Sequence, residues 1–317
     1  MPTCSRWSDA IQPPARRGCS RRSVNQRGGS AVIAEPNVTA WPAPAKLNLM
    51  LRVLGRRPDG YHRLQTVFQF IDYGDRLRFA LREDGEIHRC VEIPGVPESA
   101  DLTVRAARAL QAHCGSRLGV DIDLDKCLPM GGGLGGGSSD AATTLVALNR
   151  LWGLDLAEDE LAAVALPLGA DVPVFVRGRA AWGEGVGEQL TPVDLPEPWY
   201  LVLIPPVQVA TAAVFGDPEL TRDSRPVKLS DFIAGDRRND CLAVVRRGYP
   251  DVAAALDWLQ GVGVAQLTGT GGCVFAAFAD QRSAQDARDR VPPLYRAFVA
   301  RGLNRSPLLD RLAYQPG

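Results

Sequence analysis

The stretch that decides the fold is residues 129–139, which read PMGGGLGGGSS. Between Gly131 and Gly137 every residue except one is glycine. Glycine has no side chain to pack and loses the most conformational freedom on folding, so the run favours a loop whose backbone closely approaches a ligand. A helix is predicted directly after it, because apolar residues recur at helical spacing from Ala141 to Trp152. Free N–H groups at the start of a helix bind phosphate oxygens, so the pattern predicts a phosphate-binding loop.

Two other glycine-rich motifs fit this stretch less well. The Walker pattern requires a lysine after the last glycine, and Ser138 stands there instead. The dinucleotide fingerprint matches at Gly131, Gly133 and Gly136, but it requires a buried parallel strand before the loop. Residues 120–125 alternate apolar residues with aspartates, which predicts a strand with one face in water. A flexible linker is disfavoured, because an amphipathic helix follows at once.

The overall composition limits the classes of partner. The chain has 317 residues with 36 basic and 36 acidic side chains, so its formal net charge is zero. Such a chain has no overall electrostatic attraction to nucleic acid or to an acidic membrane. No apolar run reaches the roughly 18 residues of a membrane span, and the seven cysteines form no C-x-x-C pair of the kind found in zinc sites. We therefore expect small-molecule partners, no nucleic acid, no membrane and no metal held by a protein cluster.

Residues 1–38 differ from the rest of the chain. They contain six arginines against only Asp9 and Glu35 as acids, and they show no hydrophobic period. This composition predicts a disordered, Arg-rich extension. The extension is interpreted as dispensable in a cytoplasmic protein, with an organelle transit peptide as the alternative.

Hydrophobic patterning from Trp41 onward predicts a folded chain. A helix is expected at residues 102–112 with Asp101 as its cap, and Ser138 or Ser139 is the expected cap of the helix after the glycine loop. Strands and helices follow one another without strict alternation, which favours an α+β fold with mixed or antiparallel sheets. The predicted strands lie at residues 46–53, 64–70, 76–81, 120–124 and 199–204, and further helices at 161–165 and 252–259. Residues 266–267 and 274–278 flank a second turn of small residues.

Three segments of this chain resemble the motifs of the GHMP kinase superfamily. Residues 129–139 closely resemble its central motif, residues 44–49 (PAKLNL) the first, and residues 267–273 (LTGTGGC) the third. The order and separations also agree, and the resemblance runs from about Trp41 to Leu308. It implies the two-lobed GHMP kinase fold with an active site in the cleft between the lobes. The implied domains are residues 39–192, which carry the nucleotide loop, and residues 193–317.

Four further segments resemble one branch of the superfamily. They are residues 57–62 (RPDGYH), 64–68 (LQTVF), 168–175 (LGADVPVF) and 239–241 (NDC). That branch phosphorylates the 2-hydroxyl of a cytidine-linked polyol, a methylerythritol, with ATP in the non-mevalonate route to isoprenoid precursors. Another small-alcohol kinase of the homoserine or mevalonate type is the first alternative, and the Gly-Tyr-His segment argues against it. A non-catalytic nucleotide-binding sensor of the same fold is the second.

The resemblance also implies roles for single residues. Lys46 and Asp171 correspond to the catalytic pair, in which the aspartate accepts the hydroxyl proton and the lysine stabilises charge. Retention of both argues against the sensor. The residues implied to contact the substrate, four of them around the cytosine ring, are Asn48, Tyr61, His62, Thr211 and Phe215. The residues implied to bind the nucleotide are Pro129, Met130, Gly131, Gly132, Gly133, Leu134, Gly135, Gly136, Gly137, Ser138 and Ser139.

The resemblance leaves the metal and one residue open. ATP chemistry implies Mg²⁺, which is expected to rest mainly on phosphates and water, with Ser138 or Ser139 as a possible contact. Asp101 stands where the family pattern has an asparagine that helps to hold the nucleotide. An aspartate accepts hydrogen bonds but repels phosphate, so Asp101 is left out of the expected site.

Overall fold

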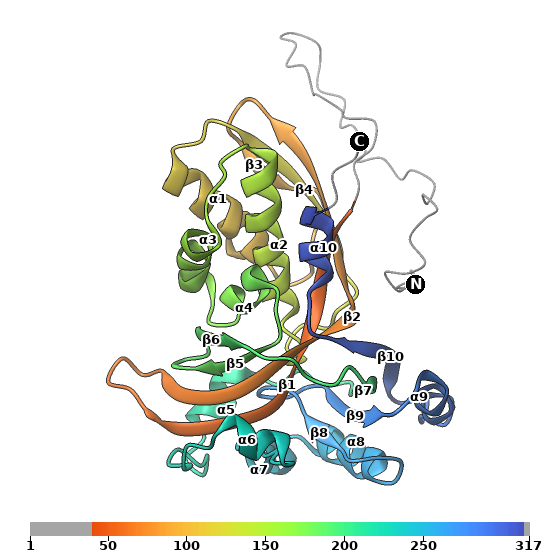
Figure 1. Ribbon diagram of the computed structural model, residues 1–317. Coiled ribbons are helices and arrows are strands. Elements are labelled where there is room, and N and C mark those ends of the chain that lie inside the picture. The colour runs from red at the N-terminus through yellow and green to blue at the C-terminus, as the bar shows by residue number, and fades with distance from the viewer. Residues whose placement is uncertain (1–39, 314–317) are drawn as a thin grey trace.

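The computed structural model describes residues 40–313. Residues 1–39 and 314–317 lie outside the described part, and with them the predicted extension at residues 1–38. Figure 1 shows two parts, one above the other, and a long pair of strands that runs through both. The sequence prediction of a two-lobed α+β architecture is confirmed by this arrangement.

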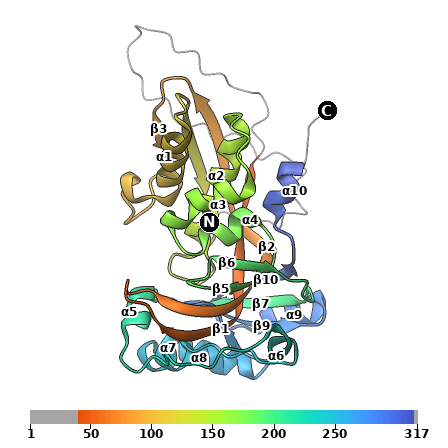
Figure 2. The ribbon, with the colours of Figure 1, turned by 60° about the vertical axis from the view of Figure 1, so that its left-hand side comes forward.

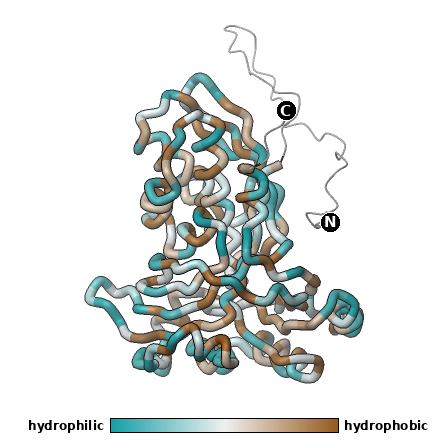
Figure 3. Tube along the Cα trace, viewed as in Figure 1, coloured by the Kyte–Doolittle hydropathy of each residue, from teal (hydrophilic) through white to brown (hydrophobic). Residues whose placement is uncertain are grey.

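The long pair of strands is an antiparallel hairpin. It consists of β1 (Trp41–Arg56) and β2 (His62–Arg82), and its turn is hydrophilic (Figure 3). The prediction of two separate strands within residues 64–81 was wrong, because β2 continues through Gly74. A Cβ atom at Gly74 would lie 2.2 Å from the carbonyl oxygen of Ala43, so the two strands approach here as only a glycine allows.

The N-terminal part packs helices beside its strands. β2 pairs antiparallel with β4, β4 pairs parallel with β3, and β5 pairs with both β2 and β6. Figure 2 shows the first three helices packed together beside these strands, and their apolar faces form the core of this part. The strands are β3 (Ile87–Arg89), β4 (Gly119–Asp125), β5 (Ala181–Glu184) and β6 (Gln189–Pro192). The helices are α1 (Leu102–Cys114), α2 (Gly136–Leu151), α3 (Glu158–Ala165) and α4 (Val172–Arg177), with 3₁₀ turns at Glu98–Ala100 and Leu166–Leu168.

The C-terminal part contains an antiparallel sheet in the order β10-β7-β9-β8. Helices lie below this sheet (Figure 1). Apolar residues of the sheet and the helices form a second core. Its strands are β7 (Trp199–Ile204), β8 (Gln266–Leu267), β9 (Val274–Phe278) and β10 (Arg296–Leu303). Its helices are α5 (Thr211–Gly216), α6 (Leu229–Ile233), α7 (Leu242–Gly248), α8 (Pro250–Gln260) and α9 (Gln281–Arg288).

The two parts are connected by more than one crossing of the chain. β10 pairs with β2 as well as with β7, and α10 (Pro307–Ala313) returns to pack on β1 beside the N-terminal part. We propose a domain boundary near residue 192, between β6 and β7, with α10 as a return of the chain. Within residues 40–313 the helices are all too short or too polar to cross a membrane.

Candidate active site

A cavity of about 880 Å³ lies where the two parts meet. Its lining comes from the β1–β2 hairpin, the glycine-rich loop, the start of α4, the start of α5 and the loop between β8 and β9. These are the segments that carry the three sequence motifs and the additional matches around residues 57–62. The fold therefore brings together segments that are more than 200 residues apart in the chain.

The glycine-rich loop runs directly into α2. Gly135 takes the N-cap position in the left-handed conformation, with φ of 74°, and within residues 40–313 no side chain caps the first turn. The expected cap by Ser138 or Ser139 was therefore wrong: Ser139 is buried and its hydroxyl donates a hydrogen bond to the Pro44 carbonyl, 2.7 Å away. A glycine cap leaves the amide groups of the first turn to a ligand such as phosphate.

The glycine-rich loop packs against the third motif, residues 267–273. The Cys273 amide donates to the Gly132 carbonyl at 2.9 Å. A Cβ atom at Gly133, whose φ is 75°, would lie 2.3 Å from the Thr268 carbonyl oxygen. Glycine is therefore required here by both conformation and space. Nine of the eleven loop residues line the cavity, whereas Leu134 and Ser139 turn into the protein.

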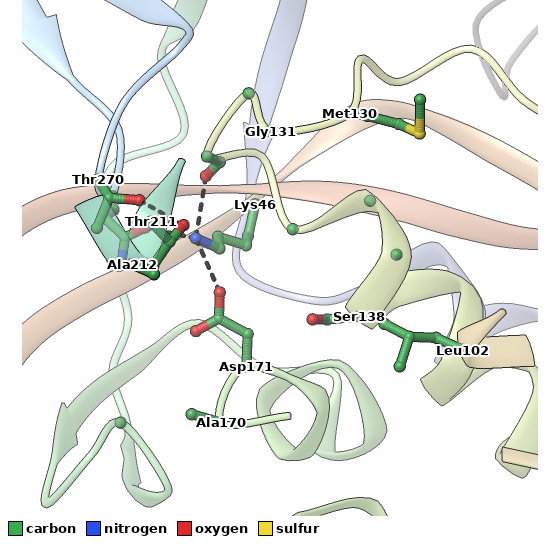
Figure 4. Close-up of a pocket in the computed structure, with 18 of the residues that line it drawn as sticks. Lys46, Leu102, Met130, Gly131, Ser138, Ala170, Asp171, Thr211, Ala212 and Thr270 are labelled. Carbon is green, nitrogen blue, oxygen red and sulfur yellow. Dashed lines mark hydrogen bonds and ion pairs between the residues drawn. The ribbon is translucent and has the colours of Figure 1, made fainter. Parts of the chain in front are cut away.

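Lys46 is the buried cation of the site. Its Nζ lies 3.2 Å from Asp171 Oδ2 and donates to the Gly133 carbonyl at 3.0 Å and to Asn48 Oδ1 at 2.5 Å. Figure 4 shows Lys46 and Asp171 pointing toward one another, with the Ser138 hydroxyl turned to the same space. Lys46 lies inside β1 beside a β-bulge and does not open the strand, because β1 already begins five residues earlier. The ammonium group is thus held by a rigid strand.

Asp171 approaches Lys46 from the opposite side of the cavity. It stands directly before α4, with Pro173 in the first turn of that helix, and its side chain makes no capping hydrogen bond. The Asp171 side chain is 36% exposed, compared with 3% for Lys46. One carboxylate oxygen therefore contacts the lysine, and the group keeps acceptor capacity toward the cavity.

Asn48 holds Lys46 from behind. Its Oδ1 accepts from Lys46, its Nδ2 donates to Thr66 Oγ1 at 2.8 Å, and its backbone amide donates to Thr268 Oγ1 at 3.0 Å. The side chain lines the cavity, but both of its ends are engaged within the protein. This arrangement ties β1, β2 and the third motif to the lysine.

The residues expected around a cytosine ring lie together at one end of the cavity. His62 is buried and stacks on Phe215, with ring centroids 5.0 Å apart and an interplanar angle of 18°. Tyr61 is 62% exposed at the rim. Thr211 Oγ1 lies 2.9 Å from Thr270 Oγ1, which connects α5 to the third motif. All four expected residues of this pocket line the same cavity.

The opposite end of the cavity was missed by the sequence interpretation. Apolar side chains from the segment before α1, from the first residue of α1 and from β4 line it, including Ile93, Val96 and Leu102. Asp101, which was left out of the expected site, also lines this end, but its carboxylate accepts from Thr103 N and pairs with Arg89. Burial acts to raise the pKa of Asp101, and the hydrogen bonds from Thr103 and Arg89 outweigh it, so the net pKa is lowered.

A second lysine–aspartate cluster lies next to the glycine loop. Lys126 Nζ lies 2.5 Å from Asp75 Oδ2 and 2.7 Å from Asp140 Oδ2. Asp140 lines the cavity, and within residues 40–313 its Oδ1 has no hydrogen-bond partner. Burial raises the pKa of Asp140 well above its usual value, although Lys126 opposes this. The sequence signal was only that Lys126 stands three residues before the loop.

The two parts of the chain match two family descriptions. Residues 101–179 match the family described as "GHMP kinases N terminal domain", and residues 227–296 match "GHMP kinases C terminal". Two solved structures share the fold. Homoserine kinase from Cytophaga hutchinsonii is 16% identical with a TM-score of 0.58, and the match covers 89% of this chain and 98% of that one. Mevalonate kinase from Methanococcus jannaschii is 15% identical with a TM-score of 0.65, and the match covers 86% and 100%. Fold and motifs together define the class as a GHMP kinase.

Relatives with higher sequence identity indicate which kind of GHMP kinase the chain resembles. A protein of Pseudomonas syringae pv. syringae named "4-diphosphocytidyl-2-C-methyl-D-erythritol kinase" is 60% identical over 271 residues, which is 86% of this chain and 96% of that protein. A protein of the same name from Halorhodospira halophila is 58% identical, covering 87% and 96%. The crystal structure of 4-(cytidine 5'-diphospho)-2C-methyl-D-erythritol kinase is 32% identical with a TM-score of 0.73, covering 83% of this chain and 99% of that one.

The chain belongs to the family of 4-diphosphocytidyl-2-C-methyl-D-erythritol kinases. It is an enzyme, a kinase, and a GHMP kinase uses ATP as its phosphate donor. The identities of 58–60% to this family, against 15–16% to the homoserine and mevalonate kinases, disfavour the first alternative. The relatives are named as kinases, which likewise disfavours the second alternative, a non-catalytic nucleotide-binding sensor.

Proposed function

We propose that the enzyme transfers the γ-phosphoryl group of ATP to the 2-hydroxyl of 4-diphosphocytidyl-2-C-methyl-D-erythritol. The products are the 2-phosphate and ADP, in a step of the non-mevalonate route. The observation that supports this most directly is that one cavity holds both the Lys46–Asp171 pair, beside the glycine loop, and the His62–Phe215 pocket. The relatives' common name supports the choice of substrate.

Asp171 is the proposed general base. Its partly exposed carboxylate takes the proton of the 2-hydroxyl while that oxygen forms a bond to the γ-phosphorus and the bond to the β-phosphate oxygen breaks. Lys46, held by Asn48 and the Gly133 carbonyl, supplies positive charge next to the reacting groups. This positive charge stabilises the negative charge that develops as the hydroxyl oxygen attacks.

The phosphates are proposed to rest on the glycine loop and the uncapped first turn of α2. Mg²⁺, when bound with ATP, neutralises charge on the phosphate oxygens. Among residues 40–313 no group of three His, Cys, Asp or Glu residues could hold a metal ion alone. The cavity does offer the Ser138 hydroxyl and the Asp171 carboxylate. These oxygens fit an ion whose remaining ligands are phosphate and water.

The two bases are proposed to occupy opposite ends of the cavity. The end lined by Ile93, Val96 and Leu102 suits the apolar faces of adenine. The end with His62 and Phe215 suits cytosine, as the sequence resemblance implied. The proposed partners are therefore two small molecules. The cytoplasm is the proposed location, in keeping with the bacterial origin of the relatives.

The proposal is tested with the purified full chain and a panel of alcohols. ADP formation and product phosphorus spectra are measured with 4-diphosphocytidyl-2-C-methyl-D-erythritol, homoserine and mevalonate. We expect a new phosphate ester only on the cytidine-linked compound. Turnover of mevalonate or homoserine at a comparable kcat/KM would contradict the proposal and support a different alcohol as substrate.

A further inference from the structure

We propose that Arg222 is a positioning residue that fixes His62 in the tautomer with its proton on Nδ1, so that the pocket selects cytosine over uracil. The inference rests on the proposed function, which places a pyrimidine beside His62. Arg222 lies in the loop after α5, behind the aromatic wall of the pocket.

The guanidinium of Arg222 is held in a fixed orientation. Its Nε donates to His62 Nε2 at 3.2 Å. Its Nη2 donates to the carbonyls of Phe215 at 2.8 Å and Asp217 at 2.7 Å, and its Nη1 donates to the Leu220 carbonyl at 3.2 Å. Three backbone acceptors therefore lock the group, and one donor remains aimed at the imidazole.

This contact determines where the ring proton of His62 lies. Arginine carries donors only and stays charged, so Nε2 of His62 must be the acceptor. A neutral imidazole has one N–H group, which then stands on Nδ1. Burial lowers the pKa of His62, and the neighbouring charges of Arg222 and Arg56 lower it further, so the ring is neutral near pH 7. Phe215 stacks on the ring and restricts its rotation.

A fixed Nδ1–H group distinguishes the two pyrimidines. N3 of cytosine is a hydrogen-bond acceptor, whereas N3 of uracil carries a proton and is a donor. The Nδ1–H of His62 therefore pairs with cytosine N3 but opposes uracil N3–H. An unconstrained histidine would adapt by moving its proton to Nε2, and Arg222 prevents this adaptation. Uracil would bury two opposed donors, its own N3–H and the Nδ1–H of His62, and the cost of leaving them unpaired selects cytosine.

The tautomer is measured on the full chain without ligand by nitrogen NMR of the histidine rings. The chain has three histidines, and the side chains of His88 and His113 are 49% and 42% exposed, so they serve as internal controls. We expect His62 in the wild type to carry Nδ1–H and to have a pKa lowered from its ordinary value. In Arg222→Met the Nε2–H form should appear and the pKa of His62 should rise, because one of the positive charges that lower it is gone.

A matched variant separates this effect from the loss of any nearby arginine. Arg225→Met removes an exposed arginine three residues away, and it should leave the His62 signals unchanged. If Arg222→Met kept His62 in the same Nδ1–H tautomer with the same pKa, the positioning role would be refuted.

Selectivity is measured with cytidine-linked and uridine-linked methylerythritol diphosphates. In Arg222→Met we expect the preference for the cytidine compound to fall by about tenfold through KM, with KM for ATP unchanged. An equal loss for both compounds would show a merely structural role and overturn the selectivity. If the wild type phosphorylated neither compound, the proposed function would be wrong. Titration with CMP and UMP, observed at the His62 ring, would then still test the choice of base.

Discussion

Two lysine–aspartate clusters lie at the cavity, and they differ in how far their carboxylates are exposed to solvent. Lys46 has one carboxylate partner, Asp171, whose side chain is 36% exposed. Lys126 has two, Asp75 and Asp140, whose side chains are 0% and 4% exposed. The first cluster keeps acceptor capacity toward the cavity, whereas the second neutralises charge inside the protein. Exposure of the carboxylate, rather than the presence of an ion pair, therefore identifies the group suited to proton transfer.

The largest expected effect is on the chemical step. Asp171→Asn keeps the size of the side chain but cannot take a proton. We expect kcat to fall by about 10²–10⁴ while ATP and the cytidine substrate still bind. Single-turnover kinetics with both ligands saturating measure this step. A near wild-type rate would show that positioning by the loop suffices and that Asp171 is not the base.

The second prediction concerns the pair as a unit. Lys46→Met removes the charge and keeps most of the stem, so kcat should also fall strongly. The double variant with Asp171→Asn should be little slower than the slower single variant, because groups that act together are not additive. Full additivity of the two losses in kcat would mean that the residues act independently.

The third prediction concerns the stability of the protein rather than its activity. Lys126→Met removes the cation that the buried carboxyl groups of Asp75 and Asp140 share, so we expect the free energy of unfolding to fall by about 3–5 kcal/mol. Lys46→Met is the matched control, since Asp171 is open to solvent, and it should cost less stability. Urea denaturation compares the two variants. Equal losses would contradict the division into an open pair and a buried cluster.

The smallest effect is expected for Asp140→Asn, and it depends on pH. The pKa of Asp140 is raised in the folded protein by burial. A raised pKa gives a contribution to stability that is complete below the unfolded value and is lost as pH rises through the folded value. The wild type should therefore lose stability relative to Asp140→Asn as pH rises. Melting curves from pH 4 to 8 test this, and the opposite trend would show that Lys126 dominates.

The sequence predicted those parts of the site that depend on residues close together in the chain. The glycine run predicted a ligand-facing loop before a helix, and Gly133 and Gly135 show why no larger residue fits. The strand at residues 120–124 and the cap by Asp101 were also confirmed. In contrast, the cap by Ser138 or Ser139 was wrong, because hydroxyl residues next to a helix start do not show which backbone group they will meet. Ser139 instead bonds to Pro44, which is distant in sequence.

The missed features depend on tertiary contacts. Ile93 and Leu102 are ordinary apolar residues in sequence, and only the fold brings them to the lining of the cavity. The continuity of β2 through Gly74 likewise depends on how closely β1 approaches. The catalytic roles of Lys46 and Asp171 stay predictions, although the structure brings their side chains together as the sequence resemblance implied.

The β1–β2 hairpin fixes the distance between the proposed catalytic lysine and the proposed cytosine pocket. Lys46 lies inside β1, and His62 opens β2 opposite Arg56, so one pair of strands carries both the proposed chemistry and the recognition of the base. The length of a strand grows by roughly 3.3 Å per residue. The span between the reacting phosphate and the pyrimidine is therefore counted in strand residues. A two-residue insertion in each strand would preserve the facing of every side chain and lengthen the substrate that fits.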